Sequence, residues 1–181
     1  KSALKDLVSQ YEVDFVIANG DGATGGFGIG KNHSVYLRKL GLDVITSGEC
    51  IYYKKDMVPH IQKAPYILRA ANYPPGNPGR GWKIYEKDGK SIAVISLLGQ
   101  SGFQRVHLSN PFTFLPEITS RLSTCPVKIL DFHAATTAEK NTMFFHADGL
   151  VSAVIGTHSK ALTADERIMK KGTAVITDAG R

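Results

Sequence analysis

The sequence predicts an α/β fold in which helices pack on a mixed sheet. Short apolar runs rich in valine and isoleucine alternate with segments of helical periodicity along nearly the whole chain. One hairpin signal interrupts this alternation, so the expected sheet contains antiparallel as well as parallel strands. With 181 residues, of which 43% are hydrophobic and 21% charged, the chain can bury a substantial core as a single domain over residues 1–181.

The first half of the chain is expected to alternate helix and strand. Apolar residues at i, i+3, i+4 and i+7 within 4–11 predict a helix that packs on one face. The run VDFVIA, residues 13–18, predicts a buried strand that leads into a glycine-rich loop. The further elements expected in this half are a helix near 34–40, a strand at 42–46, a helix near 54–62 and an extended segment at 66–72.

The second half of the chain is expected to begin with a β-hairpin and then to alternate helix and strand again. Asp88-Gly89 separates two β-rich runs within 82–99, and this pair suits a type I′ turn because its central positions need positive φ. The alternation after the hairpin predicts helices near 112–122 and 138–145 and strands at 127–132, 151–156 and 173–178.

Composition and charge exclude several classes of protein. No apolar run approaches the roughly 18 residues that span a bilayer, and residues 1–10 are amphipathic, unlike a secretory signal. Two cysteines, Cys50 and Cys125, are too few for a disulfide framework or a thiolate zinc cluster, so a cytoplasmic setting is expected. The net charge of +6 favours small anionic partners, but its basic residues are too scattered to indicate nucleic-acid binding.

The loop after the first predicted strand contains two partial nucleotide-binding patterns. Three glycines form G-x-G-x-x-G from Gly20 onward, and residues 25–32 approach the P-loop pattern. The dinucleotide motif needs a helix that opens inside it, whereas glycines continue to Gly30. The P-loop pattern fails at Asn32, where a magnesium-binding hydroxyl is required. A glycine-rich surface loop is therefore favoured. Nucleotide binding by this loop stays open as a further hypothesis, which predicts that mutation of Gly25 abolishes binding of ATP or NAD.

Four predicted strands end in potential metal ligands. The carboxyl ends of neighbouring strands in an α/β sheet form one crevice, so these side chains can meet although they are distant in sequence. A polar residue after a strand is common, but four in succession, three of them beside glycine, favour a site. Two carboxylates and two imidazoles suit zinc, manganese or iron. The candidate ligands are Asp21, Glu49, His133 and His158, with Cys50 nearby, whereas His33, His60, His107 and His146 lack such placement.

Several longer segments resemble a known family. They include IANGDGATGGFGIG, ITSGECIYYKK, LDFHAATTAEK and SAVIGTHSKALTADERI. These segments are similar to the bacterial YmdB-like branch of the calcineurin-type metallophosphoesterases, which is related to 2′,3′-cyclic nucleotide phosphodiesterases. The resemblance implies a four-layer α/β/β/α sandwich with a dinuclear metal centre at the strand ends. It also implies that the family's first strand, with an aspartate ligand, precedes Lys1 and that its last strands lie beyond Arg181.

Some ligand positions of the family are substituted in this chain. The resemblance places Asp21 at a bridging glutamate, Gly22 at an asparagine and Glu49 at a second asparagine, while His133 and His158 match unchanged. It therefore implies one divalent ion at most, iron, manganese or zinc, and leaves a metal-free site open. The ligands implied for this ion are Asp21, Glu49, His133 and His158.

Two further substitutions concern catalysis. The resemblance places Cys50 at the family's histidine that protonates the leaving group, and a thiol with a pKa near roughly 8.5 is a poor substitute for it. The resemblance places Lys160 at the second histidine of the family's G-T-H-x-H pattern, which implies that a ligand of the first metal position is missing. Its ammonium is expected to occupy that position and to pair with Asp21 and Glu49. Cys50 and Lys160 are the candidate catalytic residues.

The expected function is metal-assisted hydrolysis of a phosphodiester, such as a 2′,3′-cyclic nucleotide, by an altered site. The alternative is a catalytically inactive homologue that keeps the fold as a binding, regulatory or assembly module. A protein partner or a homo-oligomer stays open under either hypothesis. Metal content and phosphodiester hydrolysis distinguish the two, because only the enzyme hypothesis requires both.

Overall fold

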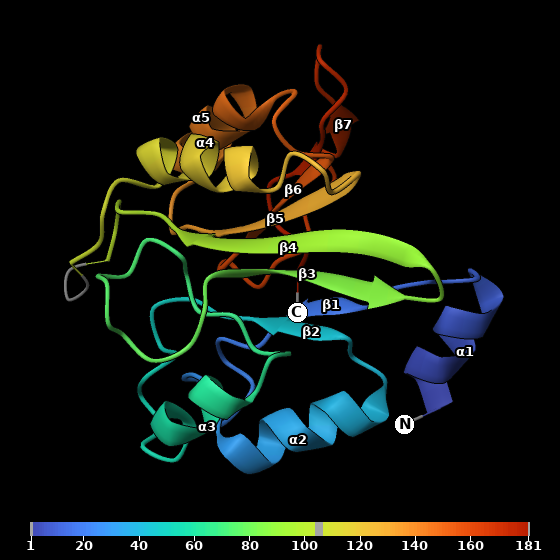
Figure 1. The fold of residues 1–181 in the computed structure, drawn as a ribbon, viewed down its shortest axis with the longest axis vertical. Helices are drawn as coiled ribbons and strands as arrows, with labels where there is room; N and C mark the ends of the chain where they lie inside the picture. Colours follow the sequence, from blue (N-terminus) through green and yellow to red (C-terminus); the bar gives the residue numbers. More distant parts are fainter. Residues whose placement is uncertain (1, 104–106, 181) are drawn as a thin grey trace.

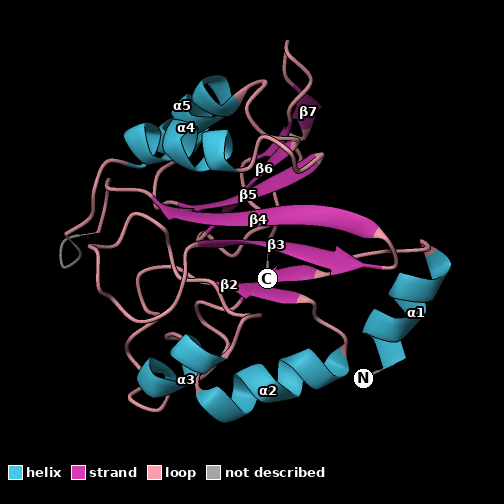
Figure 2. Ribbon diagram, viewed as in Figure 1, coloured by secondary structure: helices cyan, strands magenta, loops and turns pink. Residues whose placement is uncertain are grey.

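The computed structural model describes residues 2–103 and 107–180 and shows a four-layer α/β/β/α sandwich (Figure 1). Helices α2 and α3 cover a two-stranded sheet, a six-stranded sheet lies behind it, and α4 and α5 cover the far side (Figure 2). The elements are α1 (Ser2–Gln10), β1 (Ile17–Asn19), α2 (Lys31–Leu40), β2 (Val44–Thr46), α3 (Met57–Lys63), β3 (Trp82–Lys87), β4 (Lys90–Leu98), α4 (Pro111–Arg121), β5 (Val127–His133), α5 (Thr137–Ala147), β6 (Ala153–Thr157), β7 (Arg167–Ile168) and β8 (Ala174–Ile176).

The sheets have the mixed character that the sequence predicts. β1 and β2 pair in parallel, and the larger sheet has the order β3-β4-β5-β6-β8-β7. Its central strands β4, β5, β6 and β8 are parallel, whereas the edge strands β3 and β7 are antiparallel to their neighbours. The predicted hairpin is confirmed, because Lys87 pairs with Lys90 and the turn residues Asp88 and Gly89 have φ of 51° and 74°.

Three hydrophobic clusters fill the three interfaces between the layers. Leu115 and Phe144 belong to the cluster between α4, α5 and the larger sheet. Ile45 and Ile61 belong to the cluster between the smaller sheet and the helices that cover it. A smaller cluster that includes Val44, Leu68 and Val94 lies between the two sheets. Because every strand except the exposed β7 contributes to at least one of these clusters, the apolar runs of the sequence are the positions that the layers bury.

Some predicted elements differ from the observed ones. The first strand is confined to Ile17–Asn19, and the segment at 66–72 forms only single bridges, which join Ile67 to Ile45 and Leu68 to Arg80. No pattern in the sequence predicts β7, because its two residues are exposed and short edge strands need no apolar pattern. None of the helices in the described residues is long and apolar enough to cross a membrane.

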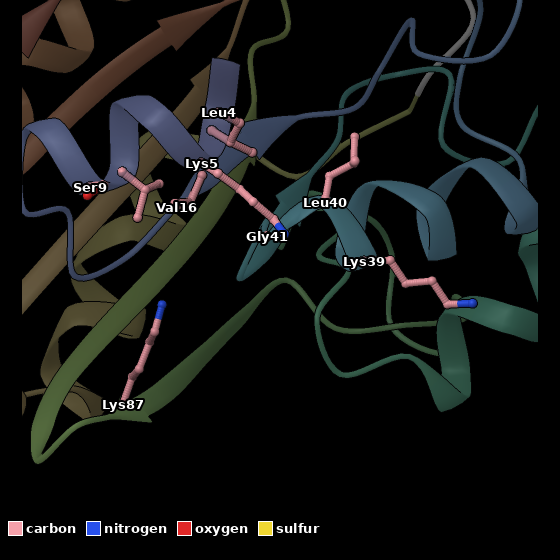
Figure 3. A pocket seen from close by; sticks show the side chains of 9 residues that line it. Leu4, Lys5, Ser9, Val16, Lys39, Leu40, Gly41 and Lys87 are labelled. Atoms are coloured by element: carbon pink, nitrogen blue, oxygen red, sulfur yellow. The ribbon is translucent and has the colours of Figure 1, made fainter. Parts of the chain in front are cut away.

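A small pocket of about 340 Å³ lies between α1 and the end of α2, remote from the strand ends (Figure 3). Leu4 and Val16 contribute apolar wall, while Lys5 and Lys87 bring ammonium groups to its edge. None of the candidate ligands lines it. The pocket therefore adds nothing to the predicted site.

Asp43, at the start of β2, joins the two sheets electrostatically. Its Oδ2 accepts a 2.9 Å hydrogen bond from the Val16 amide and lies 2.9 Å from the ammonium of Lys87. Burial alone would raise the pKa of Asp43, but these donors and the nearby Arg38 lower it overall. Its ionised form therefore stabilises the folded state above the unfolded pKa of about 3.9, and this contribution is lost as the pH falls through the lowered folded pKa.

Asp43→Asn is expected to lower the free energy of unfolding by about 1–2 kcal/mol at pH 7, since charged hydrogen bonds contribute on this scale. Urea denaturation of both proteins at pH 7 and pH 3 measures the difference, which should shrink at the lower pH. Asp14→Asn is the matched control, because Asp14 pairs with Lys90 but is exposed. A difference between wild type and Asp43→Asn that stays constant with pH would contradict this account.

Candidate metal centre

The ends of four strands bring the predicted ligands into one cluster. Asp21 and Glu49 follow β1 and β2 of the smaller sheet, whereas His133 ends β5 and His158 follows β6 of the larger one. His133 Nε2 lies 2.9 Å from Glu49 Oε2 and 3.9 Å from Asp21 Oδ2. His158 Nδ1 lies 3.2 Å from the same His133 nitrogen. The convergence expected from the sequence is thus observed, although the strands belong to two facing sheets and not to one.

The cluster comprises two overlapping groups of potential metal ligands. Glu49, His133 and His158 form one group, and Asp21, Glu49 and Cys50 form the other. Within each group the potential ligand atoms lie within 4.8 Å of one another. Carboxylate, imidazole and thiolate are the ligand types that zinc, iron and manganese accept in proteins.

One buried oxygen supports the fit of a cation. Asp21 Oδ1 is shielded from solvent and has no hydrogen-bond partner among the described residues. Its other oxygen accepts a 3.1 Å hydrogen bond from the Cys50 amide. A buried carboxylate oxygen without a donor is costly, and a bound cation would satisfy it. The residues present therefore fit one divalent ion.

Glycines allow the two sheets to approach at the cluster. A β-carbon on Gly48 would overlap the imidazole of His133, so only glycine leaves room for that ring. Asn19, at the end of β1, donates a 2.8 Å hydrogen bond to Asp131 Oδ2 on β5 and so ties the sheets together. The Gly20 amide continues the β1–β2 pairing by donating to the Thr46 carbonyl. These contacts fix the position at which the chain leaves β1 and enters the loop that carries Asp21.

A buried hydrogen-bond chain orients His133. Thr157 Oγ1 donates to Asp131 Oδ1 at 2.7 Å, which leaves this hydroxyl oxygen free to accept from His133 Nδ1 at 2.9 Å. With its proton on Nδ1, the ring presents Nε2 to Glu49, Asp21 and the other imidazole. Metal-binding histidines commonly have such an acceptor behind them, because it fixes both the tautomer and the ring plane.

The charges in the cluster shift one another's pKa values. Burial alone would raise the pKa of Glu49, but the adjacent His133 lowers it to about 2. Burial raises the pKa of Asp21, an effect that His133 opposes and Glu49 reinforces. Burial opposes protonation of His133, yet Glu49 and Asp21 together raise its pKa. In the metal-free protein the imidazolium of His133 is therefore the cation that compensates the carboxylates.

Cys50 lies beside both carboxylates. Its side chain is buried, and Sγ lies 3.7 Å from Glu49 Oε1, to which the thiol donates. Burial and the charges of Asp21 and Glu49 raise the pKa of this thiol to about 12. The thiol thus stays protonated near neutral pH unless a metal displaces its proton.

The expected ion pairs of Lys160 with Asp21 and Glu49 are wrong. No such pair occurs among the described residues, and the counter-charge near the carboxylates belongs to His133. Lys160 lies on an exposed turn with φ of 63°, and its Nζ would be 3.3 Å from a β-carbon on Gly22. Its ammonium therefore stands at the edge of the cluster, where water solvates it.

Sequence reasoning missed several residues that shape the site. Phe103 stacks on His133 with ring centroids 6.1 Å apart and meets His158 edge-on at 5.2 Å. Asp131 and Thr157 lie within or at the end of strands and are buried. Asp131, a charged residue between the apolar residues Leu130 and Phe132 of β5, was the one available signal, because buried carboxylates are rare unless they have partners. The cluster opens into a cleft of about 950 Å³ between the sheets.

This sandwich, with histidines and carboxylates gathered at its strand ends, has the fold of the calcineurin-type metallophosphoesterases. The chain belongs to the family of YmdB-like proteins, whose model matches residues 1–181.

Curated and solved relatives agree with this assignment. The chain is 38% identical to a 2′,3′-cyclic-nucleotide 2′-phosphodiesterase of Bacillus subtilis over 99% of its own length and 68% of the relative's. It is 36% identical to a putative phosphatase/phosphodiesterase of Mycoplasma pneumoniae, over 99% and 65% of the two lengths. The chain thus spans about two thirds of these relatives.

Solved structures give the same picture of the fold. A crystal structure described as a novel phosphatase from Mycoplasma pneumoniae superposes with a TM-score of 0.91 at 34% identity, covering 98% of this chain and 64% of the other. A putative 5′-nucleotidase from Staphylococcus aureus reaches a TM-score of 0.68 at 16% identity, with 97% and 42% covered. At that identity the likeness concerns the fold alone.

Proposed function

We propose that this chain hydrolyses a phosphodiester with the help of one divalent ion, held by Asp21, Glu49, His133 and His158. The observation that carries the proposal is the pair of overlapping ligand groups that share Glu49, one with His133 and His158 and the other with Asp21, whose Oδ1 is buried without a partner. The names of the Bacillus and Mycoplasma relatives support the reaction class. The Bacillus relative makes a 2′,3′-cyclic nucleotide the proposed substrate.

The residues of the chain divide the work by position and charge. A bound divalent ion supplies Lewis acidity toward a phosphoryl oxygen and lowers the pKa of a bound water. His133, fixed from behind by Thr157, and the carboxylate of Glu49 would hold that ion. Lys160 lines the same cleft, and its ammonium offers a counter-charge to a phosphate at the edge of the cluster.

Cys50 limits the rate of the proposed reaction. A thiol with a pKa of about 12 holds its proton too tightly to be an efficient acid near neutral pH. Hydrolysis is therefore expected to be slow for substrates with a poor leaving group.

Because Cys50 and Cys125 are both free and buried, the cytoplasm remains the proposed compartment.

Purified protein loaded with Mn²⁺ or Fe²⁺ provides the test. We expect metal-dependent hydrolysis of bis-p-nitrophenyl phosphate and, more slowly, of 2′,3′-cyclic AMP, because the first substrate has the better leaving group. Both activities should disappear when His133 is replaced by alanine. Cys50→Ser, by contrast, should retain most of the activity toward bis-p-nitrophenyl phosphate. Activity that survives His133→Ala would overturn the assignment of the reaction to this cluster.

A second candidate function follows from the same substitutions. The raised pKa of Cys50 and the solvated position of Lys160 remove two groups that a fast phosphodiesterase would use. A chain that binds metal stoichiometrically but hydrolyses neither substrate would favour a binding, regulatory or assembly module. A partner protein or a second copy of the chain would then be its ligand.

A further inference from the structure

A buried ion pair lies directly behind the candidate metal centre. Lys140 on α5 and Asp178, which follows β8, are each 1% exposed, and Lys140 Nζ lies 2.9 Å from Asp178 Oδ2. Burying two charges costs several kcal/mol of desolvation that their mutual attraction offsets only with good geometry and further hydrogen bonds. The pair therefore persists only because further contacts compensate its desolvation. The remaining contacts of the Asp178 carboxylate indicate the role of the pair.

The Asp178 carboxylate accepts two backbone hydrogen bonds. Its Oδ2 accepts from the Ser159 amide at 2.8 Å, and its Oδ1 accepts from the Gly180 amide at 3.0 Å. Ser159 follows His158 directly, so one oxygen joins the buried ammonium to the turn that carries a candidate ligand. Asp178 thereby connects α5 with the loops after β6 and β8.

The turn that Asp178 holds has an unusual backbone. His158 has φ of 115° and Lys160 has φ of 63°, conformations that residues other than glycine seldom adopt. Such strained residues persist only where surrounding contacts fix them, and they cluster at functional sites. Here the strained conformation directs the His158 ring at the cluster, with Nδ1 3.2 Å from His133 Nε2 and 3.8 Å from Glu49 Oε1.

We infer that Lys140 and Asp178 are positioning residues for His158. Lys140 neutralises and fixes Asp178, Asp178 holds the Ser159 amide, and this contact keeps the preceding residue in the strained conformation that makes it a ligand. The inference rests on the proposed metal site and adds to it two residues that touch no ligand atom of the ion.

The test compares variants that differ only in the acceptor at position 178. Asp178→Ala alone would leave Lys140 buried without a partner, so Lys140→Met is introduced in both variants to remove that charge. Lys140→Met/Asp178→Ala lacks an acceptor for the Ser159 amide, whereas Lys140→Met/Asp178→Asn retains an amide oxygen. Mn²⁺ affinity is measured by titration calorimetry, and thermal unfolding of the metal-free proteins reports whether they fold.

We expect Lys140→Met/Asp178→Ala to bind Mn²⁺ about 10–100-fold more weakly than wild type, the range typical of residues that orient metal ligands. Lys140→Met/Asp178→Asn should recover most of that loss. With Co²⁺, the visible spectrum of the alanine variant should resemble that of His158→Ala. When Lys140→Met/Asp178→Ala is combined with His158→Ala, the Mn²⁺ affinity should be no lower than in His158→Ala alone, because both changes remove the same ligand.

Asp148→Ala is the matched control, because Asp148 accepts the Lys171 amide in a loop at the other end of α5. It should leave Mn²⁺ affinity unchanged even where it lowers the unfolding temperature. Wild-type affinity in the Lys140→Met/Asp178→Ala protein, or losses that simply add to that of His158→Ala, would overturn the positioning role alone. Failure of the wild type to bind Mn²⁺ would instead overturn the proposed function.

Discussion

Replacing His133 by alanine is expected to abolish stoichiometric binding of a divalent metal. His133 Nε2 is the atom shared by the cluster, since it lies within 4 Å of the carboxylates of Asp21 and Glu49 and of the His158 ring. The loss of metal affinity in His133→Ala should exceed the roughly 10–100-fold weakening that is typical when a residue that orients a metal ligand is removed. Titration calorimetry with Mn²⁺, together with metal analysis of the purified protein, measures the effect.

The same replacement should also destabilise the metal-free protein. Asp21 and Glu49 would lose the imidazolium that compensates them, and a buried charge without its partner costs about 3–5 kcal/mol. His60→Ala is the matched control, because that ring bonds Tyr66 at 3.1 Å outside the cluster. Equal Mn²⁺ affinity in wild type and His133→Ala would show that the metal binds elsewhere.

Gly48→Ala is expected to disrupt the site sterically. The added β-carbon would coincide with the His133 ring, which cannot withdraw because Thr157 holds its other nitrogen at 2.9 Å. Overpacking of this kind typically costs about 1–3 kcal/mol, and it should displace the imidazole from the cluster. Urea unfolding and Mn²⁺ titration of the variant should therefore both show a loss.

Gly22→Ala separates this steric effect from a general intolerance of alanine in the loops. A β-carbon at Gly22 would meet only the flexible end of Lys160, at 3.3 Å, and the carbonyl of Gly26 at 3.5 Å. This variant should unfold and bind Mn²⁺ much like wild type. If Gly48→Ala behaves in the same way as Gly22→Ala, the close approach of Gly48 to the ring has no functional importance.

The sequence was sufficient for the features that local chemistry decides. The positive φ required at Asp88 and Gly89 placed the hairpin, and apolar runs that end in polar residues placed Asp21, Glu49, His133 and His158 at strand ends. The four-layer arrangement came from the family resemblance, because periodicity alone does not show that β1 and β2 form a separate sheet. Strand pairing between distant segments depends on tertiary packing.

The fine geometry of the site could not be predicted from residue types. Lys160 is near Gly22, but its backbone conformation leaves the ammonium in solvent and not between the carboxylates. The support of His133 by Asp131 and of His158 by Asp178 depends on side chains from strands and helices distant in sequence. Such contacts follow from the register of β5 and β6, which the sequence pattern does not specify.

Anomalous X-ray scattering from a crystal of the wild-type chain grown with Mn²⁺ tests the central claim most directly. We predict one strong peak per chain, within bonding distance of Asp21, Glu49, His133 and His158. No peak at these side chains, or a second peak of equal strength beside Lys160, would contradict a single-ion centre built by this cluster.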